Sequence, residues 1–239
     1  MRQKKIQLCV LLGLCVFMGS CRTPGISMMV RSLRPLDADC RVDANHFMAR
    51  GALNINASFQ YLIAVDLESV LEGEDVVGAH DHLLASEKEN RIILTGWTRQ
   101  YYLYGEGGTS KLILEEGEPI AGVLEPNASS ILTIPLSMIG PVGAYTLMDL
   151  LLKSGQGEFE TGAEVVVRFQ IQGKVASTGK KVETVPMEFP VVIYLGEALP
   201  TCEAGESLEP VGPCGLWGGQ DSFVPNCCVL NPNSGKCAN

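Results

Sequence analysis

From about residue 49 to residue 199 the sequence alternates between apolar and polar positions, with the two-residue period of half-buried strands. All the odd positions of residues 59–67 are apolar or aromatic, and residues 164–172 and 187–195 repeat this pattern. Each of the three segments should therefore be a strand with one face toward a core. Pro190 cannot donate a hydrogen bond to a neighbouring strand, so we expect an edge or a bulge there.

Weaker patterns predict further strands at 50–57, 91–104, 111–115 and 131–137, with turn residues between them. Only Gly143–Lys153 has room for a helix. About seven short strands over some 150 residues, with little helix, are typical of an antiparallel β-sandwich of the immunoglobulin-like type. The sequence therefore predicts an all-β fold.

The first 20 residues have the order of a secretory signal peptide. A short basic start precedes an apolar run, Leu8–Met18, which is followed by the small residues Gly19 and Ser20. The run is too short to cross a bilayer as a helix. Its eleven residues at about 1.5 Å each reach roughly 16 Å, about half of a ~30 Å hydrocarbon core.

Met18-Gly19-Ser20-Cys21 resembles the lipobox of bacterial lipoproteins, in which an apolar residue and two small residues precede a cysteine. The resemblance implies cleavage before Cys21, a diacylglycerol group on its sulfur and a further acyl chain, such as palmitate, on the new amine. Each buried methylene contributes about 0.8 kcal/mol, so two or three chains hold a protein firmly on a membrane. The alternative is an ordinary signal peptide with Cys21 incidental. Similarity to enteric lipoproteins, through the residue Arg22, favours sorting to the outer membrane.

Two segments flank the predicted sandwich. Residues 21–48 contain two prolines and alternating charges without clear periodicity, and we interpret them as a tether. Residues 200–239 hold five of the nine cysteines and few aliphatic residues, so no core can come from them. The predicted organisation is a signal peptide, 1–20, the tether, a sandwich domain, 49–199, and a small disulfide-stapled appendage in the tail.

Six cysteines remain once the two of the signal peptide and Cys21 are set aside. They are Cys40, Cys202, Cys214, Cys227, Cys228 and Cys237. An even count in an exported chain predicts three disulfides, and six cysteines allow fifteen pairings. A bridge between the neighbours Cys227 and Cys228 would be strained, which leaves twelve pairings open. Because the other five lie in the tail, Cys40 is the only outside partner and should pair with one of them. The alternative of a zinc site lacks both a CxxC pair and a histidine beyond His82.

The composition limits the class of protein. Apolar residues make up 46% and charged residues 19% of the 239 residues, which suits a folded protein with a sizeable core. The formal net charge is -9, and loss of the three basic residues of the signal peptide leaves 15 basic against 27 acidic residues, or -12. Such an acidic surface argues against nucleic acid and against electrostatic adhesion to anionic lipid.

Two clusters could carry chemistry. His80-Asp81-His82 would place two imidazoles on one side of a strand, where they could share a metal. The acidic stretch around them favours a solvated loop, and no third ligand can be identified. Trp97 and Tyr101 should share one face of a strand, and Tyr102 and Tyr104 the other. Exposed aromatic residues could stack on sugar rings, but burial of one pair in the core is the simpler interpretation.

The sequence has no Gly-rich phosphate loop, GxSxG elbow or HExxH motif. With three histidines and no positional signal, a catalytic triad cannot be argued. We therefore predict no catalytic residue, no metal ligand and no cofactor.

Several short stretches together resemble a family of lipoproteins of Gram-negative bacteria to which no activity has been assigned. They are Tyr61–Leu67, Asn90-Arg91-Ile92, Phe189-Pro190-Val191, Gly219-Gln220-Asp221 and Cys227-Cys228. The likeness covers most of the mature chain, and the double-cysteine ending is its most specific part. The central region is similar to the sandwich of late-embryogenesis-abundant (LEA14-like) domains, which implies no catalysis and no catalytic residues.

The sequence favours a non-enzymatic lipoprotein of the cell envelope, held at the outer membrane by lipid and serving as a binding or assembly module. Its partner would be an envelope protein or a glycan, and not a nucleic acid. An envelope hydrolase, metal-assisted through His80 and His82, is the first alternative. A purely structural surface protein is the second.

Overall fold

The computed structural model describes most of the chain beyond residue 26. The described residues are 27–71, 90–104, 110–126, 130–153, 162–196, 201–208, 212–216, 218–221 and 227–229. The signal peptide with Cys21, the pair His80 and His82, and Cys237 lie outside them.

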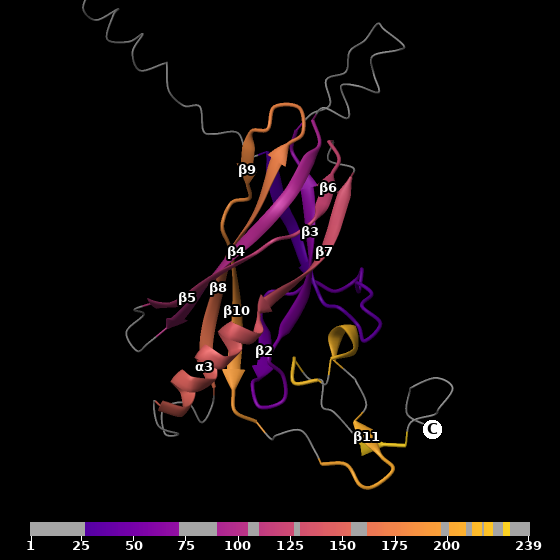
Figure 1. Ribbon diagram of the computed structural model, residues 1–239, viewed down its shortest axis with the longest axis vertical. Helices are drawn as coiled ribbons and strands as arrows, with labels where there is room; N and C mark the ends of the chain where they lie inside the picture. Colours follow the sequence, from indigo (N-terminus) through magenta and orange to yellow (C-terminus); the bar gives the residue numbers. More distant parts are fainter. Residues whose placement is uncertain are drawn as a thin grey trace, which may run out of the picture.

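The described residues are mostly in strands, with one α-helix (Figure 1). The strands are β1 (Met28–Arg34), β2 (Gly51–Asn54), β3 (Tyr61–Ser69), β4 (Ile92–Tyr104), β5 (Ser110–Glu118), β6 (Gly122–Leu124), β7 (Ile131–Ile139), β8 (Ala163–Val175), β9 (Lys181–Glu183), β10 (Met187–Tyr194), β11 (Ser207–Leu208) and β12 (Cys227–Cys228). The helix is α3 (Pro141–Lys153), and a 3-10 turn, η2 (Pro213–Gly215), lies in the tail. The prediction of a β-rich chain is confirmed, and so is a helix over Gly143–Lys153, which begins two residues earlier, at Pro141.

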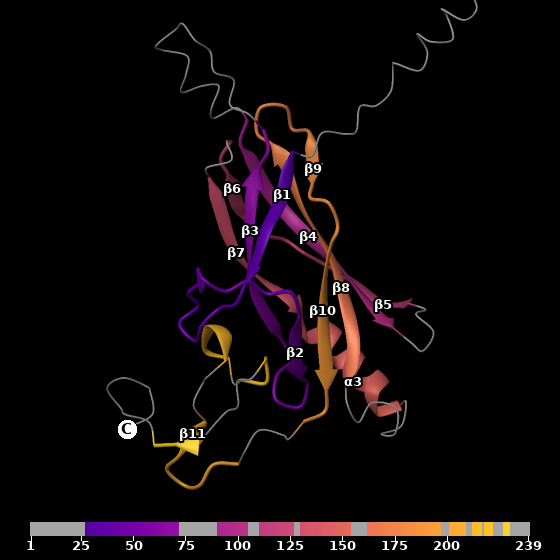
Figure 2. The same ribbon diagram turned by 180° about the vertical axis from the view of Figure 1, so that it is seen from behind.

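The longer strands form two sheets around one core. The smaller sheet has the order β1-β3-β7, and the larger has the order β2-β10-β8-β4-β5, with β6 paired to β4 and β9 to β8. Every pair is antiparallel except β2 with β10, which run parallel. The inward side chains of both sheets belong to a single apolar cluster. Figure 2 shows β1 and β3 on the near side of the molecule, with the strands of the larger sheet beyond them.

The three segments with the clearest alternation are β3, β8 and β10. Their odd residues point inward and are buried, among them Ile63, Val65, Val167, Phe169, Phe189 and Val191. The strand β10 pairs with β8 along its length, whereas its pairing with β2 begins only at Val191. Among the described strands, Pro190 therefore has a partner on the β8 side only and stands at a local edge. The prediction made for this residue is confirmed.

The prediction of a tether over residues 21–48 is wrong for residues 28–34. Residues 28–34 form β1, which pairs with β3, and both Met28 and Leu33 are buried in the core. The pairing contains an irregularity between Val30 and Ser32. Such a bulge shifts the side chains from one face to the other, so the strand shows no two-residue period in the sequence. Only residues 22–27 are left to connect Cys21 to the body.

Asp66 lies on the outer face of β3, yet it is only 1% exposed. Ser32 and Thr133 donate hydrogen bonds to its carboxylate over 2.5 and 2.6 Å, and Arg34 Nε lies 2.6 Å from one of its oxygens. Burial alone raises the pKa of Asp66, but the two hydrogen bonds and the charge of Arg34 outweigh it and hold the pKa below its ordinary value. One carboxylate thus joins all three strands of the smaller sheet.

This lowered pKa predicts a pH-dependent stability. A carboxyl group whose pKa is lower in the folded than in the unfolded chain stabilises the fold above its unfolded pKa, and this contribution is lost as the pH falls through the folded value. Asp66→Asn should lower the free energy of unfolding by about 1–3 kcal/mol at pH 7, and the difference from wild type should shrink below about pH 4. Urea denaturation of both proteins at pH 7, 4 and 2.5 measures this difference in the free energy of unfolding. Asp149→Asn, which alters an exposed pair with Lys153, is the control. If Asp66→Asn lowered the free energy of unfolding equally at all three pH values, the assignment would be contradicted.

Candidate functional site

The C-terminal tail is bound to the body by a disulfide between Cys40 and Cys214, which are 174 residues apart. The prediction that Cys40 pairs with a tail cysteine is confirmed. A second bridge joins Cys202 to Cys227 within the tail, and Cys228 is also disulfide-bonded. All five cysteines of the described residues are therefore oxidised.

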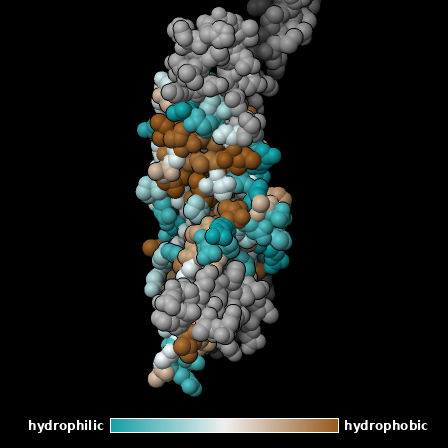
Figure 3. All heavy atoms as spheres, turned by 90° about the vertical axis from the view of Figure 1, so that its right-hand side faces the viewer, coloured by the Kyte–Doolittle hydropathy of each residue, from teal (hydrophilic) through white to brown (hydrophobic). Residues whose placement is uncertain are grey.

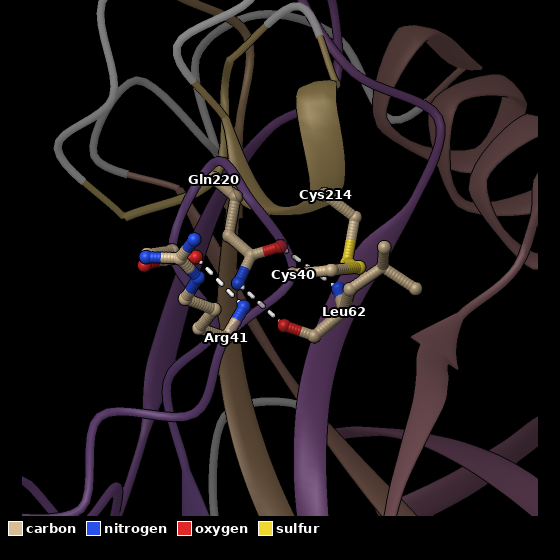
Figure 4. The surroundings of a disulfide bond; sticks show 6 residues. Cys40, Arg41, Leu62, Cys214 and Gln220 are labelled. Carbon is tan, nitrogen blue, oxygen red and sulfur yellow. Dashed lines mark hydrogen bonds between the residues drawn. A yellow bond between two sulfur atoms is a disulfide. The ribbon is translucent and has the colours of Figure 1, made fainter.

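The Cys40–Cys214 bridge lies where a turn of the body meets the tail (Figure 4). Both cysteines adopt the left-handed backbone region, with φ of 63° and 56°. The carbonyl oxygen of Asp37 accepts hydrogen bonds from the backbone N–H of Cys40 (3.1 Å) and of Cys214 (2.9 Å). The turn thus holds the tail through the backbone as well as through sulfur.

Six residues beyond Cys214, the side chain of Gln220 pairs with the backbone of β3. Its amide nitrogen donates to the carbonyl of Leu62 over 2.7 Å, and its amide oxygen accepts from the Leu62 N–H over 2.8 Å (Figure 4). A side-chain amide carries a donor and an acceptor side by side, as a peptide group does. Gln220 is 1% exposed. Through its two hydrogen bonds with Leu62, its side chain extends the smaller sheet as a paired backbone residue would.

The backbone beside Gln220 pairs instead with β2, in the larger sheet. Asn54 N–H donates to the carbonyl of Gly219 over 2.6 Å, and Asp221 N–H donates to the carbonyl of Ala52 over 2.7 Å. Gly219 has φ of 83°, and a Cβ there would lie 2.8 Å from that of Ala57, so a glycine is required. The segment Gly218–Asp221, which we call the strap, thus connects the two sheets.

The last residue of the strap, Asp221, is hydrogen-bonded to the buried hydroxyl of Tyr61. The hydroxyl of Tyr61 lies 2.9 Å from both carboxylate oxygens of Asp221, and Ala52 N–H donates to the same carboxylate over 2.9 Å. Burial raises the pKa of Tyr61, and the charge of Asp221 raises it further, so the phenol stays protonated and donates. The polar groups of the strap are thus engaged in holding the fold. The sequence had singled out Gly219-Gln220-Asp221 only through a family resemblance.

A second buried polar group, Arg99 on β4, lies inside the body. Its guanidinium donates to Glu116 over 2.8 Å, to Glu118 and, over 2.6 Å, to the carbonyl of Ser137 on β7. It also lies 4.8 Å from the centre of the Trp97 ring. Arg99 is 2% exposed and joins the larger sheet to the smaller one. No sequence signal marked it, because an arginine in an alternating strand is expected on the polar face.

The aromatic cluster of β4 divides as predicted. Trp97 and Tyr101 are buried, and Tyr101 donates a hydrogen bond to Glu116 over 2.6 Å. Tyr102 and Tyr104 lie on the opposite face, where Tyr104 is exposed. The inward pair therefore belongs to the core, and the described residues place no set of stacked, exposed aromatic rings on this strand.

Among the described residues, an apolar, partly open cavity of about 100 Å³ between α3 and the larger sheet is suited to a ligand. Its lining comes from four elements that the fold brings together at one end of the body (Figure 1). The lining residues are Leu147, Leu150 and Leu151 of α3, Leu103 of β4, Ala163 and Val165 of β8, and Ile193 of β10. Because every lining residue is apolar, the side chains offer a water molecule no hydrogen-bond partner there.

The start of α3 packs closely against β4 because two glycines precede and begin it. A Cβ at Gly140 would collide with the guanidinium of Arg99, and one at Gly143 would lie 2.7 Å from the Tyr101 ring. These two glycines let the first turn of α3 approach the polar cluster closely. Further along, the helix contacts the sheet through leucine side chains, and the cavity lies among them.

The described residues contain no group of three or more His, Cys, Asp or Glu side chains able to hold a metal ion. No protein-family model matches the chain, and no curated protein matches its sequence. In the described part of the chain, no helix has the length and hydropathy needed to span a bilayer.

Proposed function

We propose that the protein is a lipoprotein of the cell envelope, anchored through lipid on Cys21, and that its body is a β-sandwich of the immunoglobulin-like or LEA14-like type serving as a non-enzymatic binding module. The carrying observation is the apolar cavity beneath α3. A cavity of about 150 Å³ with this kind of lining stays dry and binds benzene or xenon. The ligand class is an apolar group of similar size, such as the end of an alkyl chain.

The cysteines support the envelope location. Disulfides persist in oxidising compartments and are rare in the cytosol. The five described cysteines are all oxidised, and the remaining cysteine of the tail, Cys237, is the expected partner of Cys228. Together with the signal-peptide pattern of residues 1–20 and the lipobox ending in Cys21, this oxidation favours a protein exported and then retained at a membrane.

Binding in the cavity can be tested with xenon and benzene as probes. NMR of methyl-labelled protein should show shifts at Leu147, Val165 and Ile193 when either probe is added. Ala163→Leu places a larger side chain in the cavity and should remove these shifts, whereas Ala176→Leu, on an exposed turn, should leave them unchanged. Absence of shifts in the wild-type protein would overturn the proposed site.

Anchoring is tested separately. Cys21→Ala should release the protein from the membrane fraction into soluble periplasmic or secreted fractions, because no acyl chain can then be attached. Intact mass spectrometry of the wild-type protein should show cleavage before Cys21 and the added acyl mass. Membrane association of the variant equal to that of wild type, with an unmodified Cys21, would refute the anchor.

A further inference from the structure

One end of the body carries most of the exposed apolar residues of its strands. We call it the β1 end, because β1 begins there (Figure 2). Pairing places the start of β1, the end of β3 and the start of β7 together, and it places β6 and the β8–β9 hairpin beside the start of β4. Figure 3 shows apolar atoms gathered in the upper part of the side on which β6 and β7 lie.

On the larger sheet these residues form a cross-strand row with two lysines. Val123 of β6 pairs with Ile93 of β4, Ile93 pairs with Lys174 of β8, and Lys174 pairs with Lys181 of β9. Directly paired residues present their side chains on the same face. All four are exposed, Ile93 by 46% and Val123 by 45%. The exposed Lys180 adds a third ammonium group beside the row.

The smaller sheet repeats the arrangement on its own outer face. Met29 of β1 and Ile131 of β7 flank Glu68 of β3, and both apolar side chains are about two-fifths exposed. Val70 follows directly after β3 and is exposed as well. Glu68 is ion-paired with Arg31, so its charge is partly compensated. Apolar side chains therefore surround this end on both outer faces.

The short connection between Cys21 and β1 indicates what covers the β1 end. Because β1 begins at Met28, only residues 22–27 separate it from Cys21. The seven Cα-to-Cα steps from Cys21 to Met28 span at most about 25 Å when the chain is fully extended. A tether that continued to residue 48 would have allowed several times that distance, but residues 28–34 are a strand of the body. An acylated Cys21 therefore holds the start of β1 within about 25 Å of the lipid surface.

We propose that the β1 end rests on the membrane, with its exposed apolar side chains in the interfacial region and its lysines beside anionic headgroups; this inference rests on the proposed lipid attachment at Cys21. Apolar side chains of interfacial segments enter a membrane by about 5–10 Å. Lys174 and Lys181 of the larger-sheet row lie within a few residues of the tip of the β8–β9 hairpin, at about 3.3 Å per residue, which is within that depth. The whole chain is acidic, but the row on the larger sheet carries lysines, and Glu68 in the row on the smaller sheet is ion-paired with Arg31.

Exposed apolar residues of α3, at the opposite end of the body, provide a control. Val142 and Leu152 on α3 are 59% and 55% exposed, more than any apolar residue of the two rows. They share the chemistry of the β1 end without the short connection to Cys21. If exposure alone caused membrane contact, the α3 surface would make it equally well.

The closing experiment places the full acylated protein in nanodiscs of phosphatidylethanolamine and phosphatidylglycerol that contain spin-labelled lipid. Methyl signals of Ile93, Val123 and Ile131 should broaden, and those of Val142 and Leu152 should not. In parallel, the unacylated Cys21→Ala chain should bind vesicles of the same lipids weakly. Ile93→Ser with Val123→Ser should reduce that binding about tenfold, whereas Val142→Ser with Leu152→Ser should leave it unchanged. Lys174→Glu should reduce binding to anionic vesicles only.

The outcomes separate this inference from the proposed anchor. If mass spectrometry finds the acyl groups but both ends of the body broaden alike, or neither does, the inference fails and the anchor stands. If no acyl group is found, the anchor fails and the inference, which rests on it, fails as well. Protection of the β1 end by a co-purifying protein, without lipid contact, would also overturn the inference.

Discussion

Replacing both Cys40 and Cys214 with alanine is expected to lower the stability of the protein by about 5 kcal/mol. The bridge closes a loop of 174 residues, and the chain-entropy model assigns a closure of this length about 5 kcal/mol. A typical domain has only about 5–15 kcal/mol of net stability. The variant should therefore unfold at a much lower urea concentration, and the strap should separate from β2 and β3 first.

The second bridge provides the matched control. Removing Cys202 and Cys227 opens a loop of 25 residues within the tail, for which the same model gives about 3–4 kcal/mol. Hydrogen exchange at Ala52 and Leu62, which bond to the strap, reports strap docking directly. Exchange there should accelerate in the Cys40/Cys214 variant and change little in the control. Equal protection in both variants would show that the disulfide is not what retains the strap.

Arg99→Ala is expected to cost about 3–5 kcal/mol, the range for removing one partner of a buried ion pair. The change leaves Glu116 with a largely buried charge, and it leaves the Ser137 carbonyl on β7 without its donor. It also removes the cation that lies over Trp97. Because the guanidinium joins the two sheets, the loss should appear as a cooperative shift of the whole urea transition, followed by circular dichroism.

Arg168→Ala is the control for that prediction, because Arg168 lies on the neighbouring strand β8 but is exposed. Its loss should change stability by no more than about 0.5 kcal/mol. Gly140→Ala gives an independent check, since a Cβ there collides with the Arg99 guanidinium without removing it. An Arg99→Ala protein as stable as the Arg168→Ala protein would refute the role assigned to the cluster.

Elements whose side chains alternate regularly could be read from the sequence. In β3, β8 and β10 every odd residue except Met187 is buried, as the alternation predicts, although β3 also buries Ala64 and Asp66 and β8 also buries Val166. The strand β1 could not be found in this way, because a bulge interrupts its period and charged residues occupy its outer face. Its assignment to a tether was the main error, and the correction shortened the connection to Cys21 to six residues.

The candidate sites depended still more on tertiary contacts. Long-range pairing alone brings Gln220 to Leu62, which are 158 residues apart, and Arg99 to Ser137. The apolar cavity is lined by residues of four separate elements. Each is an ordinary apolar residue, and nothing in the sequence distinguishes it from the other apolar residues of its element. A cavity arises from the packing between elements, so no local sequence pattern could predict it.

By itself, the sequence determined the β-rich class, the strands with regular alternation, the helix before residue 153 and the pairing of Cys40 with the tail, because each depends on local periodicity or on counting. Only the tertiary structure decided which tail cysteine is the partner, where the strap binds, that Arg99 is buried and that β1 belongs to the body. These features arise from contacts between residues far apart in the chain, whose free energy depends on the positions that the whole fold gives them.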